Sequence, residues 1–149
     1  MIVTHYTPVY RDSFLALLEE MRIYETAAFD NYLLANDSYT SNYLTAKDHI
    51  VLIALKGDQV IGFMVGSHTT NYIVSVVVLY VAKAERSKGV AFKLKTTLED
   101  LCRMRGYKQI VSQVRTINTF SIALNNKAGW FCEMDKIYPD YYYWFTKTL

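Results

Sequence analysis

The chain has 149 residues, of which 52% are hydrophobic and 20% are charged, and its formal net charge is +2. This length and composition predict a single globular domain over residues 1–149 that can bury a core. The small net charge argues against general nucleic-acid binding, and no apolar stretch approaches the roughly 18 residues that a membrane helix needs.

The first third of the chain predicts a strand and then two helical segments. Residues 2–6 resemble a short strand, and Thr7-Pro8 is a typical helix start, because a proline at the first helical position lacks only an N–H that has no partner there. An apolar stripe at helical spacing follows, formed by Tyr10, Phe14, Leu17, Leu18 and Met21. A second, less regular helix is expected within residues 25–44, with a break near residues 36–38.

Three strands are predicted next. Residues 50–55 form a continuous apolar run, residues 57–58 are a turn signal, and residues 60–65 resume the strand pattern. Residues 72–82 are the longest strand candidate and are rich in β-branched side chains. Such a continuous run is typical of a central strand that is covered on both faces.

The pattern then changes to a long helix. Its predicted core stripe is Val90, Leu94, Leu98 and Leu101, and its other faces carry Lys93, Lys95, Glu99 and Arg103. We expect Gly106 to end this helix in the left-handed conformation.

The remaining residues predict a strand over 108–114, a short helix capped by Asn118 and ended by Gly129, and strands over 130–134 and 141–145. The expected order is therefore β-α-α-β-β-β-α-β-α-β-β, an α/β fold with a mixed sheet. Cys102 and Cys132 lack CxxC spacing, so we expect two inert buried thiols in a reducing compartment. Because no signal-peptide pattern opens the chain, we expect a cytoplasmic protein.

The segment K-A-E-R-S-K-G-V-A, residues 83–91, joins the longest strand to the long helix. The first N–H groups of a helix lack internal partners, and the helix dipole favours negative charge there. Gly89 has no Cβ to keep a ligand away from the backbone, and Lys83, Arg86 and Lys88 add positive charge. The segment therefore predicts an anion site.

Two motifs on these elements resemble the GNAT acetyltransferase family. Residues 86–91, Arg-Ser-Lys-Gly-Val-Ala, match the family signature R/Q-x-x-G-x-G/A, and Leu79-x-Val81 resembles the strand before it. The stretch Asn118-x-x-Ser121-x-x-Leu124-x-x-Lys127-x-Gly129-Trp130 is similar to the family's second motif, N-x-x-[AS]-x-x-L-Y-x-K-x-G-F. The resemblance implies the GNAT fold, with a mixed, mostly antiparallel central sheet and helices on both faces.

The resemblance also implies acetyl-CoA as co-substrate and no metal. It assigns the pyrophosphate to Arg86, Ser87, Lys88, Gly89, Val90 and Ala91. The pantetheine arm would pair with the backbone near Leu79 and Val81, and Asn118 would reach it from the other side. The implied function is direct acetyl transfer to a primary amine in a ternary complex. The acceptor would be a small molecule or a protein, chosen by residues 25–42 and the last two strands. The protein would be a monomer or a homodimer.

The sequence departs from the family pattern at its proton-transfer residues. Asn125 stands where many members carry a tyrosine that protonates the thiolate. Residues 72–82 contain no carboxylate, and Ser75 lies about where histone-type members place their general base. The resemblance to ribosomal-protein acetyltransferases that lack this tyrosine implies the serine of the N-x-x-S motif as the proton donor, which makes Ser121 the candidate catalytic acid as well as a cofactor contact. The base candidates are solvent and three side chains, His68, Glu133 and Asp135.

Two other function classes stay open at this point. One is a non-catalytic sensor with the same fold that binds acyl-CoA, and the other is a small α/β module that recognises a protein or nucleic acid. The three histidines, His5, His49 and His68, lack metal-ligand spacing, so no metal site is predicted.

Overall fold

The described part of the chain is residues 1–24, 49–138 and 142–149 of a computed structural model, without the side chains of residues 134–138. Its elements are β1 (Ile2–His5), a 3-10 turn (Pro8–Tyr10), α1 (Arg11–Tyr24), β2 (His49–Lys56), β3 (Gln59–Thr70), β4 (Ile73–Val81), a 3-10 turn (Lys83–Glu85), α3 (Val90–Met104), β5 (Gln109–Arg115), α4 (Thr119–Lys127), β6 (Phe131–Tyr138) and β7 (Tyr142–Thr148). These elements follow the predicted order. The helix expected within residues 25–44 lies outside the described residues.

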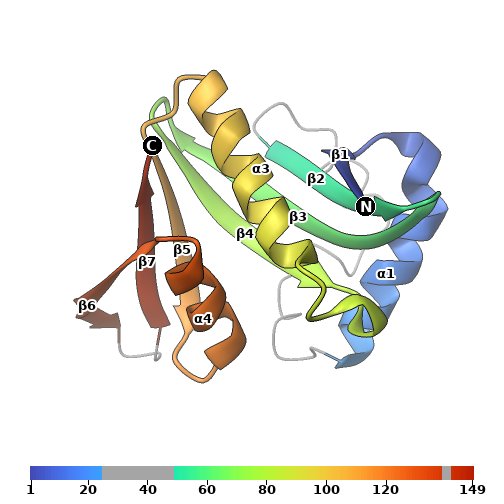
Figure 1. Cartoon of the computed structure of the whole chain (residues 1–149). Coiled ribbons are helices and arrows are strands. Elements are labelled where there is room, and N and C mark those ends of the chain that lie inside the picture. Colours follow the sequence, from blue (N-terminus) through green and yellow to red (C-terminus); the bar gives the residue numbers. More distant parts are fainter. Residues whose placement is uncertain (25–48, 139–141) are drawn as a thin grey trace.

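The strands form a sheet in the order β1-β2-β3-β4-β5-β7-β6 (Figure 1). Every neighbouring pair is antiparallel except β4 and β5, which are parallel. Two parallel strands need a long crossover connection, and α3 provides it between β4 and β5. The prediction of a mixed, mostly antiparallel sheet is confirmed, and β4 is its middle strand.

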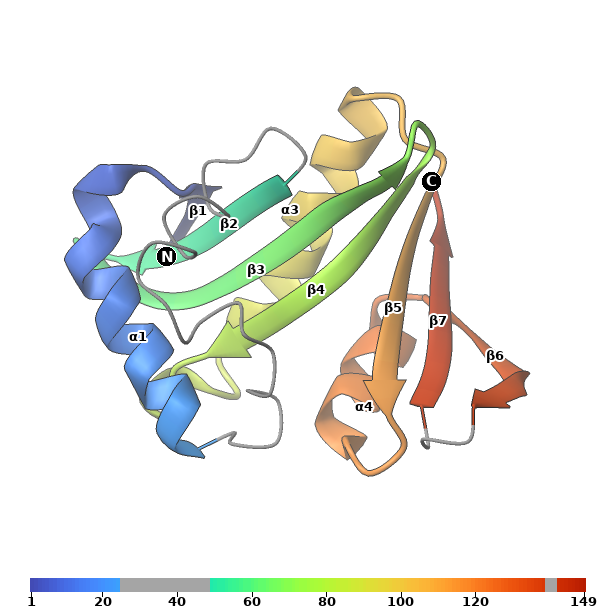
Figure 2. The same ribbon diagram turned by 180° about the vertical axis from the view of Figure 1, so that it is seen from behind.

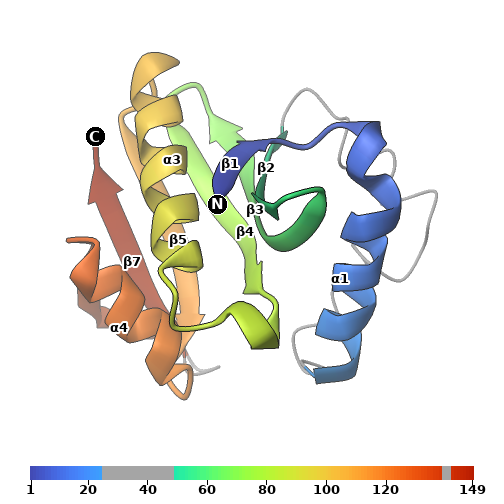
Figure 3. The same ribbon diagram turned by 45° about the vertical axis from the view of Figure 1, so that its right-hand side comes forward.

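Helices cover both faces of the sheet, as predicted. Helix α1 lies on one face and α3 on the other (Figure 3), and the view from behind brings α1 to the front (Figure 2). Each face has its own core, and successive residues of β2 alternate between the two. The α3 side receives Ile50, Leu52 and Ala54, and the α1 side receives Val51, Ile53 and Leu55.

Two glycines on β3 let α3 lie close to the sheet. A Cβ atom added to Gly62 would lie 3.0 Å from Val90 Cγ1 of α3, and one added to Gly66 would lie 3.5 Å from Leu98 Cδ1 of α3 and 2.8 Å from Val74 Cγ1 of the neighbouring strand β4. Val90 is the first residue of α3. A glycine inside a strand often marks such a close approach. The start of α3 is therefore held directly against the sheet.

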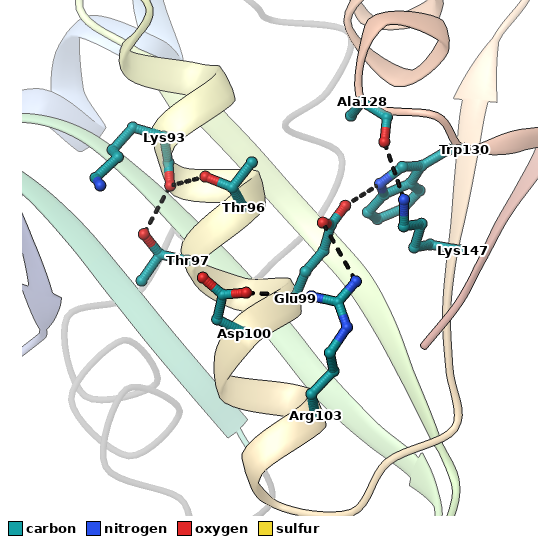
Figure 4. A network of polar contacts seen from close by, with 9 residues as sticks. All are labelled: Lys93, Thr96, Thr97, Glu99, Asp100, Arg103, Ala128, Trp130 and Lys147. Atoms are coloured by element: carbon teal, nitrogen blue, oxygen red, sulfur yellow. Dashed lines mark hydrogen bonds and ion pairs between the residues drawn. The ribbon is translucent and has the colours of Figure 1, made fainter.

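Helix α3 also carries two buried charged residues, Lys95 and Glu99, on faces that the sequence analysis placed outside the core stripe. Their exposed fractions are 2% and 6%. Trp130 covers them. The Lys95 ammonium lies 3.5 Å from the centroid of the Trp130 ring. The indole N–H of Trp130 donates to Glu99 Oε1 at 2.6 Å (Figure 4). Arg103 lies beside Glu99 Oε2 at 4.0 Å. The helical pattern predicts which residues of α3 face the sheet. It does not predict that Trp130 covers another face of the helix.

The middle of β4 is less covered than the sequence predicts. Residues 75–79 are only half-buried, although β4 is the central strand. A bulge is one cause, because Val65 pairs with Val78 whereas Gly66 pairs with Val76, which leaves Val77 without a partner in the register. Val77 and Val78 therefore both pack on the α1 side. The divergence of β5, described below, is the second cause.

The two cysteines differ in their surroundings. Cys102 is buried, as predicted, and burial raises the pKa of its thiol to about 11. Cys132 is half-buried rather than buried, and partial burial raises its pKa too. Because the reactive form of cysteine is the thiolate, both raised pKa values keep the side chains unreactive at neutral pH.

Candidate functional site

Strands β4 and β5 diverge toward their carboxyl ends (Figure 2). They pair only from Ile73 opposite Gln109 to Val76 opposite Ser112, although β4 continues to Val81 and β5 to Arg115. The loop that follows β4 and helix α4, which follows β5, both lie at this end of the sheet (Figure 1). The divergence thus places the two sequence motifs opposite each other.

The backbone of β4 directs polar groups toward this opening. The Ala82 N–H donates to Ile61 O at 2.8 Å, so Ala82 points its polar groups at β3. Successive residues of a strand alternate in this direction, and Leu79 and Val81 therefore point away from β3, to the side from which β5 has diverged. The Val81 carbonyl already accepts from Arg86 Nε at 3.0 Å, and the pairing of a pantetheine arm with the backbone near Leu79 and Val81 stays a prediction.

The loop after β4 leads into an uncapped helix. After the 3-10 turn Lys83–Glu85, Ser87 and Gly89 both have positive φ angles, 63° and 82°, and α3 begins at Val90. No side chain caps this helix end. A Cβ atom on Gly89 would meet nothing within 4 Å, so open space lies in front of the loop. The first amides of α3 can therefore donate to a ligand.

The charges of the loop are arranged around Glu85 and Arg86. Lys56 and Lys88 contact the Glu85 carboxylate at 3.0 and 3.2 Å, and these hydrogen bonds lower the pKa of Glu85. Arg86 donates through Nε to Val81 O at 3.0 Å, and its guanidinium carbon lies 5.2 Å from the Tyr80 ring centroid. The two lysines outweigh the single carboxylate, so the loop is positively charged overall.

Helix α1 holds the start of the loop through Glu20, which the sequence analysis did not single out. Glu20 Oε2 accepts hydrogen bonds from the Tyr80 hydroxyl at 2.8 Å and from the Lys83 N–H at 3.2 Å. The Lys83 ammonium lies 3.8 Å from the Tyr24 ring centroid. No local pattern could reveal a contact between residues 60 positions apart.

A pocket of about 260 Å³ lies between this loop and α4. Its lining residues are Val81, Glu85, Arg86, Ser87, Gly89, Val90, Ala91, Phe92, Phe120, Ala123, Leu124 and Lys127. Most of the predicted loop residues are among them, whereas Leu79 and Lys88 are not. The sequence analysis missed the wall that α4 contributes. Positions 120, 123, 124 and 127 have helical spacing on one face, which is the signal that could have found it.

The start of α4 carries the predicted catalytic acid. Asn118 caps this helix, because its Oδ1 accepts from the Ser121 N–H at 3.1 Å. Neither Asn118 nor Ser121 lines the pocket, and the Ser121 side chain is half-buried. Asn125, which stands where the family tyrosine is expected, is 2% exposed. Its side chain therefore lies inside the protein, where a tyrosine ring would overpack the core.

The base candidates do not gather at the pocket. His68 pairs with Val74 at the opposite end of β4, roughly 23 Å along the strand from Val81, and its Nδ1 lies 2.8 Å from the Tyr107 hydroxyl. Glu133 lies on β6, two strands beyond β5. The Asp135 side chain lies outside the described residues.

Most of the sequence matches a known family. A sequence model described as "Acetyltransferase (GNAT) family" matches residues 14–130, which include both motifs and the elements that carry them. The chain belongs to the GNAT acetyltransferase family. The search of curated proteins found no significant match.

Solved structures share the fold of this GNAT protein over nearly its whole length. A ribosomal-protein-alanine N-acetyltransferase from Brucella melitensis has a TM-score of 0.81 at 20% identity and covers 100% of both chains. The PaiA N-acetyltransferase from Thermoplasma acidophilum, in complex with coenzyme A, has a TM-score of 0.83 at 13% identity and covers 99% of this chain and 98% of its own. An aminoglycoside 6'-N-acetyltransferase from Enterococcus faecium has a TM-score of 0.76 at 16% identity, covering 99% and 97%. The GNAT fold is thereby confirmed.

Two further properties hold for the described part of this GNAT protein. None of its helices is long and apolar enough to span a membrane. No three or more of its His, Cys, Asp and Glu side chains are grouped so that they could hold a metal ion.

Proposed function

We propose that this GNAT protein is an N-acetyltransferase that moves the acetyl group of acetyl-CoA directly to a primary amine. The observation that carries the proposal is the pocket at the uncapped N-terminus of α3, with open space in front of Gly89. Acetyl-CoA supplies an activated thioester, so the protein has to bind it, orient it and manage the protons of the amine and the thiol. We propose that it does so as a single domain in the cytoplasm, without a metal.

The residues of the pocket fit the pyrophosphate of this co-substrate. The amides of Val90 and Ala91 begin α3, where a helix favours an anion. Arg86 adds charge at the pocket wall. We assign the pantetheine arm to the backbone of Leu79 and Val81, whose polar groups point away from β3.

Ser121 is the proposed proton donor to the departing CoA thiolate, and Asn118 holds Ser121 in place. The Asn118 side chain fixes the first turn of α4 by accepting from the Ser121 N–H. The buried Asn125 leaves this role to another residue, and Ser121 lies in the first turn of α4, the helix that follows β5. We propose no base among the side chains, so water takes the proton from the amine.

The acceptor class is a primary amine on a small molecule or a protein. Proteins with this fold include a ribosomal-protein-alanine N-acetyltransferase and an aminoglycoside 6'-N-acetyltransferase. The acceptor would be chosen by residues 25–42, which lie outside the described residues, and by the last two strands, β6 and β7. The protein would act as a monomer or a homodimer.

Calorimetric titration of acetyl-CoA into two variants of Gly89 tests the phosphate site. Gly89→Ala and Gly89→Glu share the cost of a side chain at a φ of 82°, about 1–2 kcal/mol, but only the glutamate adds negative charge. We expect Gly89→Ala to keep the parent affinity within a few fold. Gly89→Glu should bind at least about 100-fold more weakly, because like charges in contact cost several kcal/mol. Equal affinity of the two variants would place the pyrophosphate elsewhere.

A non-catalytic sensor of acyl-CoA is the second candidate function. Strand β4, Ile73–Val81, contains no carboxylate, and Asn125 replaces the family's tyrosine, so two usual proton-transfer groups are missing. Release of CoA, followed with a thiol reagent against a panel of primary amines, separates the two functions. Turnover with any amine supports the enzyme, whereas tight binding without turnover supports the sensor.

A further inference from the structure

We propose that Trp144 and Glu133 form a subsite for a second cationic group of the acceptor, so that the protein favours diamines over amines with a single charge. This inference rests on the proposed function, because it takes acetyl transfer to occur where β4 and β5 diverge. It deepens that function by naming the chemical class of the acceptor. The observations that carry it lie on the face of the sheet opposite the pocket.

The point where β4 and β5 separate fixes the position of the reacting acetyl group. The last pair of the two strands is Val76 opposite Ser112. If the pantetheine arm follows Leu79 and Val81 from the loop, its thioester end reaches the closed end of the divergence. The first residue of β5 after the last pair is Gln113. The reacting amine of the acceptor must therefore lie beside Gln113.

Three residues in register lead from this point across the sheet. Gln113 pairs with Trp144 of β7, and Trp144 pairs with Glu133 of β6. A chain neighbour of each packs with the core on the α3 side, namely Val114, Phe145 and Cys132. Because successive side chains of a strand alternate between the two faces, the three residues in register all point to the α1 side. Neighbouring strands are about 4.8 Å apart, so Glu133 lies roughly 10 Å from Gln113 across the sheet.

This face is open over β5, β7 and β6. Helix α1 packs on β3, and no described helix covers the other three strands on this side (Figure 2). Gln113 is exposed, and Trp144 and Glu133 are half-buried. The pocket lies on the other side, since its lining residues Val90 and Leu124 belong to the core under α3. An acceptor can therefore reach the ring and the carboxylate from the face opposite the co-substrate.

Trp144 and Glu133 together suit a cation. Tryptophan is the side chain whose ring face attracts a cation most strongly, and a carboxylate forms a charge-assisted hydrogen bond with an ammonium. A chain of methylenes that lies across the Trp144 ring would join this ammonium to the reacting amine. Arg115, two residues after Gln113, is directed to another partner, because its Nε donates to the Tyr142 hydroxyl at 3.3 Å.

The sequence that is assigned to acceptor choice has a charge of the same sign as Glu133. Residues 25–42 contain no basic residue and three acidic ones, Glu25, Asp30 and Asp37. An acidic composition favours a cationic ligand over an anionic one. We therefore assign the subsite to an acceptor with a second ammonium and not to one with a carboxylate.

Three acceptors that share one aminopentyl group test the subsite. At the far end 1,5-diaminopentane carries an ammonium, n-hexylamine a methyl group and 6-aminohexanoate a carboxylate. We expect kcat/KM for the diamine to exceed that for hexylamine by roughly 10- to 100-fold, the usual effect of one hydrogen bond to a charged group. Glu133→Gln should remove this preference and leave kcat/KM for hexylamine within about twofold.

Matched variants separate charge recognition from a structural role. Glu133→Lys should make 6-aminohexanoate the preferred acceptor, a reversal that a merely structural role cannot produce. Trp144→Leu should reduce the preference for the diamine by about threefold to tenfold, because it removes the ring face. Asp100→Asn removes an exposed carboxylate that pairs with Arg103 on α3, and it should keep the full preference.

Other results separate this subsite from the proposed function. If the parent protein acetylates hexylamine or 6-aminohexanoate as fast as the diamine, or if Glu133→Gln keeps the preference, the subsite is overturned and acetyl transfer stands. If none of the three amines releases CoA, calorimetric titration of 1,5-diaminopentane into the CoA-saturated protein decides. Tighter binding to the parent than to Glu133→Gln then supports the subsite while the proposed enzyme function fails. Equal binding, or no binding, overturns the subsite.

Discussion

Replacing the buried Lys95 should change how the stability of this protein depends on pH. The side chain is 2% exposed, with its ammonium 3.5 Å from the Trp130 ring centroid. Burial lowers the pKa of Lys95 from 10.5 to about 7, and the negative charge of Glu99 opposes part of this shift. Lys95→Met keeps most of the side-chain volume and removes the charge, while Glu99 retains its bonds to Trp130 and Arg103.

The size of the effect follows from proton linkage. Below pH 7 Lys95 is charged in both the folded and the unfolded protein, and the folded protein carries the full free-energy cost of burying that charge. Between pH 7 and 10.5 the unfolded chain binds more protons than the folded one, so the free energy of unfolding rises with pH, by roughly 1.4 kcal/mol per unit. From pH 6 to pH 9 the parent protein should therefore gain about 2.7 kcal/mol relative to Lys95→Met.

Urea unfolding of both proteins at several values between pH 6 and pH 9 measures this difference. Subtracting the two curves cancels the other titrating groups. We expect Lys95→Met to have its greatest advantage at pH 6 and to lose it steadily above pH 7. Lys93→Met, which removes an exposed lysine from the same helix, should differ from the parent by a constant amount. A constant difference for Lys95→Met as well would show that burial does not lower the pKa of Lys95.

Two further changes test the support of the site and its chemistry. Glu20→Ala removes the acceptor of the buried Tyr80 hydroxyl and should lower the free energy of unfolding by about 1–3 kcal/mol in urea denaturation. Ser121→Ala should lower kcat by roughly 10²–10⁴-fold, the usual range for a general acid, with the affinity for acetyl-CoA unchanged. Release of CoA with an accepted amine gives the rate, and calorimetry gives the affinity.

Matched comparisons test the interpretation of Glu20→Ala and of Ser121→Ala. Glu19→Ala removes an exposed carboxylate of the same helix, which pairs with Arg22, and should cost far less than Glu20→Ala. Equal costs would mean that the contact with Tyr80 contributes nothing. A Ser121→Ala enzyme that turns over as fast as the parent would leave Ser121 only a place in the first turn of α4.

The sequence by itself determined the features that depend on neighbouring residues. Asn118 caps α4, and Gly106 and Gly129 follow their helices with φ angles of 83° and 76°, as their positions predict. The loop before α3 is equally local, because Gly89 and the helix start lie within a few residues of each other. Caps and turns depend on hydrogen bonds and backbone angles within a few consecutive residues. A short sequence pattern is therefore enough to predict them.

The tertiary structure decided which residues surround the site. The sequence placed Lys95 outside the core stripe of its helix, but Trp130, 35 positions later, covers it. Lys127 lies at the pocket because β4 and β5 diverge after four paired residues and α4 follows β5. Glu20 of α1 holds the loop through Lys83, which lies 63 positions later in the chain. These contacts depend on how strands and helices pack together, and the spacing of residues along one element carries no information about its neighbours in space.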